Sequence, residues 1–245
     1  MKKESIQRDT LISADENREM FDRIAENYDR ANRILSFGRD KIWRQEAVDE
    51  LQPEEDGRYL DIGTGTGDLV VEILKQAPGA HIDAIDPSEK MLHIAKSKNL
   101  PDNVHFFSAD ATALPMEDET YDGIILGFSF RNIEQREKAI AEFFRVLKPW
   151  GRLVILEAVY PTNPIVRLGY NLYAALVPLI GKIWGEGSAY RYLMQSIKHF
   201  PKTNALFVTL HYAGFSFIKT ELKMLGTIVI FSAPRGEEPR TPPEN

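Results

Sequence analysis

Three glycines at alternate positions follow a short apolar segment and precede an amphipathic one. Residues 59–62 have the pattern of a strand, Gly63, Gly65 and Gly67 come next, and residues 69–77 place apolar side chains at helical spacing. Glycine lets a backbone turn tightly and approach a ligand closely, and the first turn of a helix offers unpaired N–H groups there. The pattern predicts a nucleotide-type pocket at the end of a strand, in preference to a glycine-rich turn without a ligand.

The spacing of the glycines narrows the choice of ligand. A dinucleotide-binding pattern that starts at Gly63 needs its third glycine at position 68, where this chain has Asp68. We expect a carboxylate at that position to repel a pyrophosphate, which disfavours a nicotinamide dehydrogenase. The Gly-Lys-Ser/Thr end of a P-loop does not follow these glycines either. A ligand that carries adenosine and a positive group, such as S-adenosylmethionine, suits this segment better.

Acidic residues follow the next two predicted strands. Residues 82–85 read as a strand, and Asp86 follows it about 20 residues beyond the glycines, where a carboxylate can bind both hydroxyls of a ribose. The alternative for Asp86 is a turn residue. Ser88 is expected to cap the next helix. After a third strand, 104–107, Asp110 either accepts from the amino group of adenine or is an ordinary loop acid.

Strand-like and helix-like segments alternate along the middle of the chain. This alternation covers residues 60–156 and predicts a parallel sheet with helices on both faces. Two β-like runs, 216–222 and 227–232, are expected to complete the sheet as an antiparallel hairpin. Amphipathic helices before the first strand form a predicted cap over residues 16–51. The fold class is therefore α/β.

The remaining segments lie around this sheet. We expect one domain over residues 16–233, a flexible segment over 1–15 and a disordered tail over 234–245 that is rich in proline and glutamate. Residues 157–200 are a predicted helical insert. Within it, residues 168–184 are mostly apolar but would reach only about 25 Å as a helix, short of the roughly 30 Å core of a bilayer. The pattern alone fits a buried helix pair and an apolar lid over a hydrophobic substrate equally well.

The order of these motifs resembles that of the class I S-adenosylmethionine-dependent methyltransferases. Residues 61–67 match the first motif of the class, residues 86–92 the second, and residues 110–115 with 121–122 the third. The resemblance implies S-adenosylmethionine as cofactor and a Rossmann-like fold with a mostly parallel, seven-stranded sheet. The cofactor-binding residues that it implies are Asp61, Gly63, Gly65, Thr66, Gly67, Asp86, Met91, Asp110, Ala111 and, through its backbone, Gly127.

Further segments resemble one branch of this class, the ubiquinone/menaquinone-biosynthesis C-methyltransferases. They are residues 33–44, 130–133, 190–201 and 213–215, and the likeness extends over residues 21–233. Members of this branch methylate a ring carbon of a polyprenylated quinol, and the hydrocarbon tail of that substrate favours the apolar lid over the buried helix pair. Demethylmenaquinol is the expected substrate, with a polyprenyl benzoquinol or another lipophilic molecule as alternatives. A non-catalytic scaffold that binds the cofactor is the alternative outside the enzymes.

The resemblance also suggests residues for the quinol side. Arg131 and Asn132, just after the fourth strand, are the catalytic candidates: Arg131 would stabilise a phenolate and Asn132 would bind a ring oxygen. Asn132 could instead cap the following helix in a capping box, and Arg131 could be a plain surface charge. Tyr28, Tyr190 and Tyr192 are expected to line the quinol pocket, or else to serve packing alone.

Composition and charge limit the possible cofactors and partners. The chain has 245 residues and no cysteine, which excludes disulfides and thiolate zinc sites, and no metal is expected. Its formal net charge of −6 argues against broad nucleic-acid binding. Residues 1–15 lack the pattern of a targeting segment, so we expect a cytoplasmic protein. Peripheral contact with the inner face of the membrane through residues 168–184 is a further expectation, and a homodimer is left open.

Overall fold

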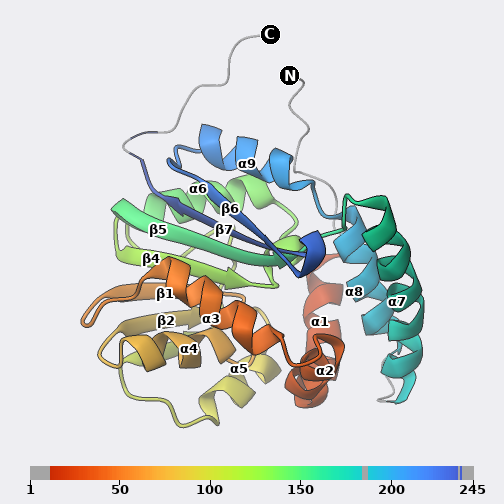
Figure 1. The fold of residues 1–245 in the computed structure, drawn as a ribbon. Coiled ribbons are helices and arrows are strands. Elements are labelled where there is room, and N and C mark those ends of the chain that lie inside the picture. Colours follow the sequence, from red (N-terminus) through yellow and green to blue (C-terminus); the bar gives the residue numbers. More distant parts are fainter. Residues whose placement is uncertain (1–11, 184–186, 237, 239–245) are drawn as a thin grey trace.

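The strands form one mixed sheet in the computed structural model, which describes residues 12–183, 187–236 and 238 (Figure 1). The sheet has seven strands in the order β3-β2-β1-β4-β5-β7-β6. The strands β1 to β5 run parallel to one another, whereas β7 pairs antiparallel with both β5 and β6. The predicted α/β fold with a C-terminal antiparallel hairpin is confirmed.

The elements follow the predicted order along the chain. The strands are β1 (Arg58–Ile62), β2 (His81–Ile85), β3 (Val104–Phe107), β4 (Tyr121–Gly127), β5 (Leu147–Ala158), β6 (Lys219–Lys223) and β7 (Ile228–Pro234). The helices are α1 (Ala14–Ile24), α2 (Tyr28–Leu35), α3 (Asp40–Leu51), α4 (Asp68–Gln76), α5 (Glu89–Lys96), α6 (Arg136–Val146), α7 (Pro164–Ile183), α8 (Gly187–His199) and α9 (Thr203–Tyr212). Short 3₁₀ segments are η1 (Ala25–Asn27), η2 (Phe130–Asn132) and η3 (Met224–Gly226).

The two faces of the sheet carry separate hydrophobic cores, because successive side chains of a strand point to opposite faces. In β4, Ile124 and Leu126 belong to the core that includes residues of α6 and α9. Ile125 between them belongs to the core that includes α3 and α4. Helices therefore cover both faces, and the central parallel strands β1 and β4 are buried on both sides as in doubly wound folds, whereas the edge strand β3 is partly exposed.

The strand order reverses between β1 and β4, which lie side by side although two strands, β2 and β3, come between them in the sequence. Helices cross from β1 to β2 on one side of this point and from β4 to β5 on the other. The carboxyl ends of β1 and β4 consequently diverge into loops that leave a crevice. This is the usual ligand-binding position of open α/β sheets.

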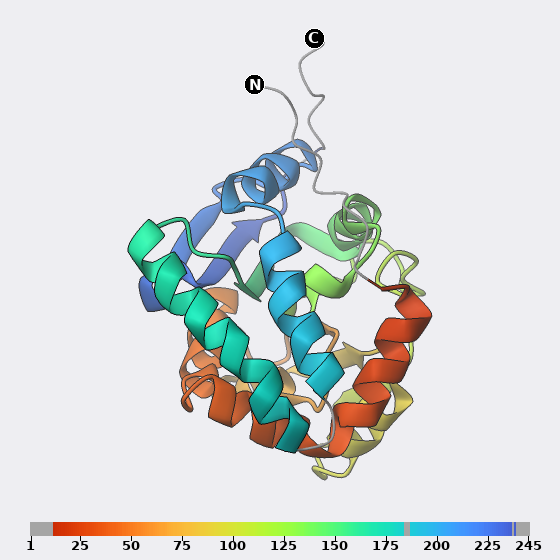
Figure 2. The same cartoon turned by 90° about the vertical axis from the view of Figure 1, so that its right-hand side faces the viewer.

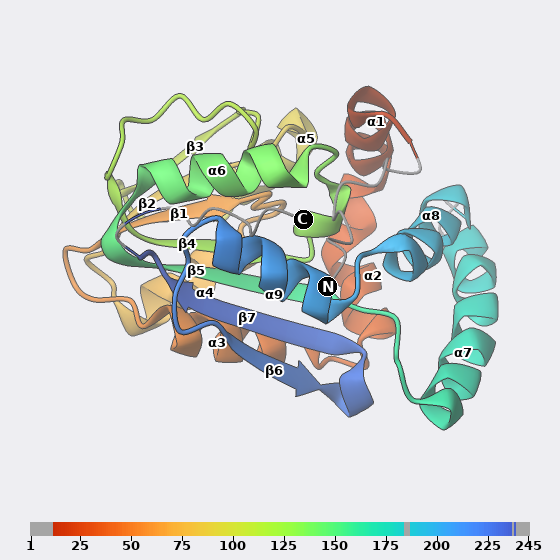
Figure 3. The same ribbon diagram turned by 90° about the horizontal axis from the view of Figure 1, so that it is seen from above.

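A layer of helices lies beyond the carboxyl ends of the parallel strands. Figures 2 and 3 show α1, α2, α7 and α8 gathered at this end. Small buried clusters hold the layer together: Met20 of α1 packs with Tyr192 of α8, and Ala31 of α2 packs with Val177 of α7. The first part of the predicted cap, α1 and α2, and the predicted insert thus form one helical cover over the strand ends. The rest of the predicted cap, α3, packs instead on one face of the sheet.

Some boundaries differ from the predicted ones. Helix α1 begins at Ala14, because the side chain of Ser13 caps it in a capping box with Glu16. In the hairpin, β6 begins at Lys219 and not at residue 216, and β7 extends to Pro234, into the predicted tail. The other predicted end segments, residues 1–11 and 239–245, lie outside the described residues. Within the part of the chain that is described, no helix is long and apolar enough to cross a bilayer.

Candidate functional site

A cavity of about 450 Å³ opens at the reversal of strand order, with α1 as its outer wall. Loops after β1, β2, β3 and β4 all contribute to it, so the predicted pocket at the end of the first strand exists. We call it the cofactor cavity. The predicted cofactor residues that line it are Gly63, Gly65, Asp86, Met91, Asp110, Ala111 and Gly127.

The glycine loop is shaped by its neighbours as well as by the cavity. The N–H groups of Gly63 and Thr64 both donate to the carbonyl of Ile85, at 2.8 and 2.9 Å. Gly63 has a positive φ of 68°, and a Cβ there would lie 2.4 Å from the Cβ of Ser129. The hydroxyl of Ser129 donates in turn to the carbonyl of Ile62. Gly63 is therefore required by the close approach of the loop after β4, in addition to any ligand.

Asp86 is the central acid of the cofactor cavity. Its Oδ2 accepts from the N–H of Gly65 at 2.9 Å and its Oδ1 from the N–H of Ser88 at 2.8 Å. Burial raises the pKa of Asp86 to about 6, and the two backbone hydrogen bonds oppose this rise. Each carboxylate oxygen has a second lone pair, so a ribose diol can still bind. Ser88 caps α5 as predicted, because its hydroxyl accepts from the N–H of Met91.

The charge of the cofactor cavity fits a cationic ligand. Asp15, Asp86, Asp110 and Glu134 line it, and among the described lining residues the basic side chain is Arg18, which is paired with Asp15 at 3.2 Å. Asp86 is buried, whereas the other three acids are exposed at the edge of the cavity. This excess of carboxylates would repel a pyrophosphate and attract a sulfonium or an ammonium group. The residues present therefore fit S-adenosylmethionine.

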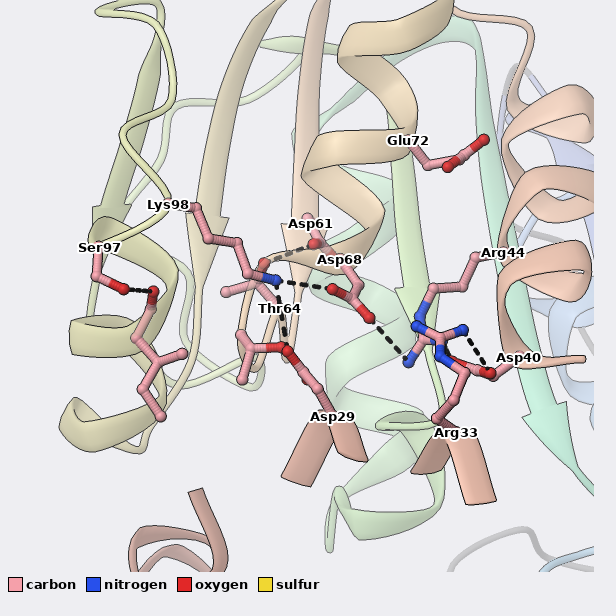
Figure 4. A network of polar contacts seen from close by, with 12 residues as sticks. Asp29, Arg33, Asp40, Arg44, Asp61, Thr64, Asp68, Glu72, Ser97 and Lys98 are labelled. Carbon is pink, nitrogen blue, oxygen red and sulfur yellow. Dashed lines mark hydrogen bonds and ion pairs between the residues drawn. The ribbon is translucent and has the colours of Figure 1, made fainter. Parts of the chain in front are cut away.

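The prediction that the carboxylate of Asp68 would repel a pyrophosphate in this cavity is wrong. Asp68 does not line the cavity. Its Oδ1 lies 2.7 Å from Nζ of Lys98, and its Oδ2 lies 3.8 Å from Nη2 of Arg44 (Figure 4). Burial alone would raise the pKa of Asp68, but these two cations outweigh it and lower the pKa. Its charge is thus neutralised within the protein. The case against a pyrophosphate rests on the other acids of the cavity.

Three predicted cofactor residues stand behind the loop and do not reach the cavity wall. Asp61 is fully buried, its Oδ2 accepts from the hydroxyl of Thr64 at 2.6 Å, and burial raises its pKa to about 7. Thr66 donates to Asp29 of α2 at 2.6 Å (its hydroxyl is turned toward the cap). Gly67 packs against Ala95 and begins α4. These residues hold the loop in place and tie it to α2.

A second cavity of about 650 Å³ lies beneath the helical cover, and its lining is mostly apolar. We call it the apolar cavity. Tyr28, Tyr190 and Tyr192, the three residues predicted for the quinol pocket, line this cavity together with residues of α1, α2, α7 and η3. Tyr28, Phe21 and Phe128 line both cavities, so these three side chains form the junction between them.

Arg131 is a charged group at the wall of the apolar cavity, and the alternative of a plain surface charge is wrong. Its side chain is only 5% exposed, and its Nη1 lies 2.6 Å from Oε1 of Glu157, which is fully buried. Burial alone would lower the pKa of Arg131, but Glu157 raises it, so the guanidinium stays charged. Nη1 also donates to the carbonyl of Phe128. Nε is buried and has no hydrogen-bond partner among the described residues.

Asn132 lies at the wall of the cofactor cavity and does not cap the next helix. Asn132 is the last residue of η2. Helix α6 begins only at Arg136, with Gln135 in the N-cap position. The hydroxyl of Tyr192 donates to Oδ1 of Asn132 at 3.1 Å and accepts from Nδ2 of Asn17 at 2.8 Å. This chain of hydrogen bonds joins α1, α8 and η2 around the junction of the cavities.

Sequence reasoning missed several residues of the site. Glu157 follows the apolar run 153–156 near the end of β5. A single acid in such a run indicates a buried cationic partner. Asn17 and Phe21 of α1, and Phe128 and Ser129 after β4, carry no comparable sign. Asn17 and Phe21 enter the site because α1 folds over the strand ends, whereas Phe128 and Ser129 line it from the loop directly after β4.

Known proteins resemble the chain in sequence over most of its length. Residues 10–234 match the model of the ubiE/COQ5 methyltransferase family. A demethylmenaquinone methyltransferase of Thermus thermophilus is 42% identical over 215 residues, 86% of this chain and 97% of that protein. A ubiquinone/menaquinone biosynthesis C-methyltransferase UbiE of Syntrophotalea carbinolica is 40% identical over 223 residues, 90% and 94% of the two chains.

Solved structures share the fold. A putative S-adenosylmethionine-dependent methyltransferase of Methanococcus maripaludis superposes with a TM-score of 0.65 at 22% identity, over 89% of this chain and 95% of that one. A possible histamine N-methyltransferase of Thermotoga maritima gives 0.63 at 22% identity, over 89% and 99%. With the sequence matches and the acidic cofactor cavity, these findings identify an S-adenosylmethionine-dependent methyltransferase. The chain belongs to the ubiE/COQ5 methyltransferase family.

Proposed function

We propose that the protein transfers a methyl group to a ring carbon of a polyprenylated quinol, with demethylmenaquinol as the favoured substrate. The observation that carries this proposal is the junction of the two cavities: an acidic one that suits the cofactor meets an apolar one at Tyr28 and Phe128. An aromatic ring with a hydrocarbon tail matches the apolar cavity. The names of the similar proteins from Thermus and Syntrophotalea support a quinol of respiratory quinone biosynthesis.

The chemistry requires an activated ring carbon and alignment. S-adenosylmethionine supplies a methyl group on a sulfonium, which becomes a neutral thioether when the S–CH₃ bond breaks. The quinol hydroxyl resembles that of tyrosine, with a pKa near 10, and loss of its proton moves electron density to the adjacent ring carbon. That carbon forms the new C–CH₃ bond and then releases its own proton, which restores the aromatic ring.

Arg131 is proposed to stabilise the phenolate that forms in this reaction. A charged guanidinium held in a mostly apolar wall favours a negative charge on a ring oxygen beside it. Glu157 fixes the orientation of the guanidinium through its 2.6 Å ion pair. The proton of the quinol is proposed to leave to a water molecule near Arg131. Asn132, held by Tyr192, is proposed to bind a ring oxygen across the junction.

Alignment is expected to contribute more than any single base. Correct placement of two reacting groups is worth about 7–11 kcal/mol, whereas general-base catalysis contributes about 10²–10⁴-fold in rate. Tyr28, Tyr190 and Tyr192 are proposed to position the quinol ring within the apolar cavity. Burial raises the pKa of both Tyr28 and Tyr192, so both hydroxyls remain protonated and act as donors.

The protein is proposed to work in the cytoplasm, with peripheral contact to the inner face of the membrane, where a polyprenylated quinol resides. The homodimer left open by the sequence stays a prediction that sedimentation analysis can check.

The test of the proposed function compares substrates. The purified chain and S-adenosylmethionine are incubated with demethylmenaquinol, a polyprenyl benzoquinol and short-chain analogues of each, and the products are identified by mass spectrometry. We expect the naphthoquinol to be methylated with the highest kcat/KM. A preference for the benzoquinol would assign the chain to ubiquinone biosynthesis. Cofactor binding without transfer to any quinol would contradict the proposal and favour the scaffold.

A further inference from the structure

Large apolar side chains surround the opening of the apolar cavity and are also exposed to solvent. Phe37 in the turn after α2 is 72% exposed, Ile165 at the start of α7 is 83% exposed, and Leu225 in η3 is 80% exposed. All three line the apolar cavity. Residues that line a cavity and face solvent at the same time form its rim, so the cavity opens between α2, α7 and η3.

The outer side of α7 continues this rim. Leu168, Leu172, Leu176 and Leu179 follow Ile165 at intervals of three or four residues, which places them on one side of the helix. Each of these leucines is more than half exposed, whereas Ala174 and Val177 on the other side pack against α2 and α8. Figure 3 shows α7 as the outermost helix at this end of the molecule. We call this stripe and the rim together the mouth surface.

The charges around the mouth surface are positive, although the whole chain carries −6. Residues 30–44 contain five arginines and lysines and a single acid, Asp40. Asp40 is bound by Arg33 and Arg44. Arg39 and Lys41 are exposed and have no ion-pair partner among the described residues. The α7 helix contains Arg167 and Lys182 and no acidic residue.

We propose that the mouth surface docks the protein on an anionic lipid bilayer, with the opening of the apolar cavity against the membrane. An apolar patch of this extent with cations beside it matches the interface of a bilayer with anionic head groups. This docking proposal rests on the proposed function because it takes a polyprenylated quinol as the substrate. A cavity of 650 Å³ is of the size that holds a drug-sized ligand. It encloses the ring and the first part of a polyprenyl tail, so the rest of the tail stays in the bilayer.

The test measures partition of the full-length chain between buffer and phosphatidylcholine vesicles with and without phosphatidylglycerol. The surface variant is Leu172→Glu/Leu176→Glu, at positions that do not line either cavity. The matched control is Phe217→Glu, which is 83% exposed at the opposite end of the sheet, before β6. We expect stronger binding to the anionic vesicles, about tenfold or more weaker binding of the surface variant, and no change in the control.

Two further measurements separate this inference from the proposed function. Methylation of a short-chain soluble quinol should be unchanged in the surface variant, while methylation of a polyprenylated quinol in vesicles should fall with partition. If wild-type protein binds vesicles through this surface but methylates no quinol, docking stands and the proposed function fails. Equal partition of wild type and surface variant would overturn the docking proposal. So would a wild-type dimer that the surface variant dissociates while vesicle binding persists, because the surface would then bind a second copy.

Discussion

The two cavities are built from the chain in different ways. The cofactor cavity consists largely of backbone turns directly after β1, β2, β3 and β4, with Asp86 as its central acid. The apolar cavity consists mostly of side chains from helices before β1 and after β5, with Arg131, paired to the buried Glu157, at its wall. Cofactor binding therefore depends on the loops at the carboxyl ends of the strands, whereas substrate choice is expected to depend on the helical cover. A change in one cavity should therefore leave the other largely intact.

The largest expected effect is on the apolar side. Arg131→Ala should lower kcat by about 10²–10³-fold, as expected when a group that stabilises an oxyanion is removed. It should leave the affinity for S-adenosylmethionine, measured by calorimetry, nearly unchanged, because Arg131 does not line the cofactor cavity. A loss of cofactor affinity as large as the loss in kcat would mean that Arg131 also acts in cofactor binding, and the two cavities would not be independent.

A companion variant guards against misfolding in that experiment. Arg131→Ala leaves Glu157 buried without its cation, which should cost about 3–5 kcal/mol in the free energy of unfolding. The double variant Arg131→Ala/Glu157→Gln removes this unpaired charge, so denaturant unfolding should show a smaller loss of stability. Its kcat should stay as low as that of Arg131→Ala. Recovery of activity together with stability would mean that Arg131 serves the fold alone.

The matching change on the cofactor side is Asp86→Ala. It should weaken S-adenosylmethionine binding by about 2 kcal/mol or more, because charge-assisted hydrogen bonds to the ribose are lost. Asp68→Ala is the control: Asp68 lies three positions beyond Gly65 but is neutralised by Lys98 and Arg44. Its loss should lower stability and leave cofactor affinity within about twofold. Equal loss of affinity in both variants would mean that the charge of Asp68 also acts on the bound cofactor.

The same division explains what the sequence could predict. Gly63 and Asp86 were recognisable because a strand, a turn and the next helix are neighbours in the sequence, and local spacing determines their positions. The charge of Asp68 was visible, but Lys98 and Arg44, which neutralise it, come from other elements. The place of Asn132 depended on Tyr192, 60 residues further on. Packing of the cover decides such contacts, and no local pattern reports it.

The affinity for S-adenosylmethionine should depend on pH through Asp86, which lies in the cofactor cavity. The pKa of Asp86 is about 6 in the folded protein against an ordinary 3.8. The folded state thus binds more protons between these values, and the free energy of unfolding should fall as pH rises through that window. A cationic cofactor favours the carboxylate, so its affinity should rise about tenfold per pH unit up to about pH 6 and level off above it.

Calorimetry of S-adenosylmethionine binding across this range checks that dependence. Asp86→Asn should abolish the step in affinity, since no titrating carboxyl remains in the centre of the cavity. The stability of this variant should still decrease as pH rises toward about 7, because Asp61 behind the loop retains its raised pKa. A step in affinity that persists in Asp86→Asn would assign the titration to another group.

The smallest effect is expected at the boundary between the cavities. Tyr192→Phe removes the hydroxyl that donates to Asn132 and accepts from Asn17, while the ring still lines the apolar cavity. A lost buried hydrogen bond costs about 1–2 kcal/mol, so stability should fall by this amount and kcat by a fewfold. Because Asn17 and Asn132 both line the cofactor cavity, the KM for S-adenosylmethionine should rise slightly as well. Tyr190→Phe on the same helix is the comparison, because the hydrogen bond to Asn132 comes from Tyr192. An equal rise in the KM for S-adenosylmethionine in Tyr190→Phe would show that α8 as a whole couples the two cavities, and that the hydrogen bonds of Tyr192 have no separate role.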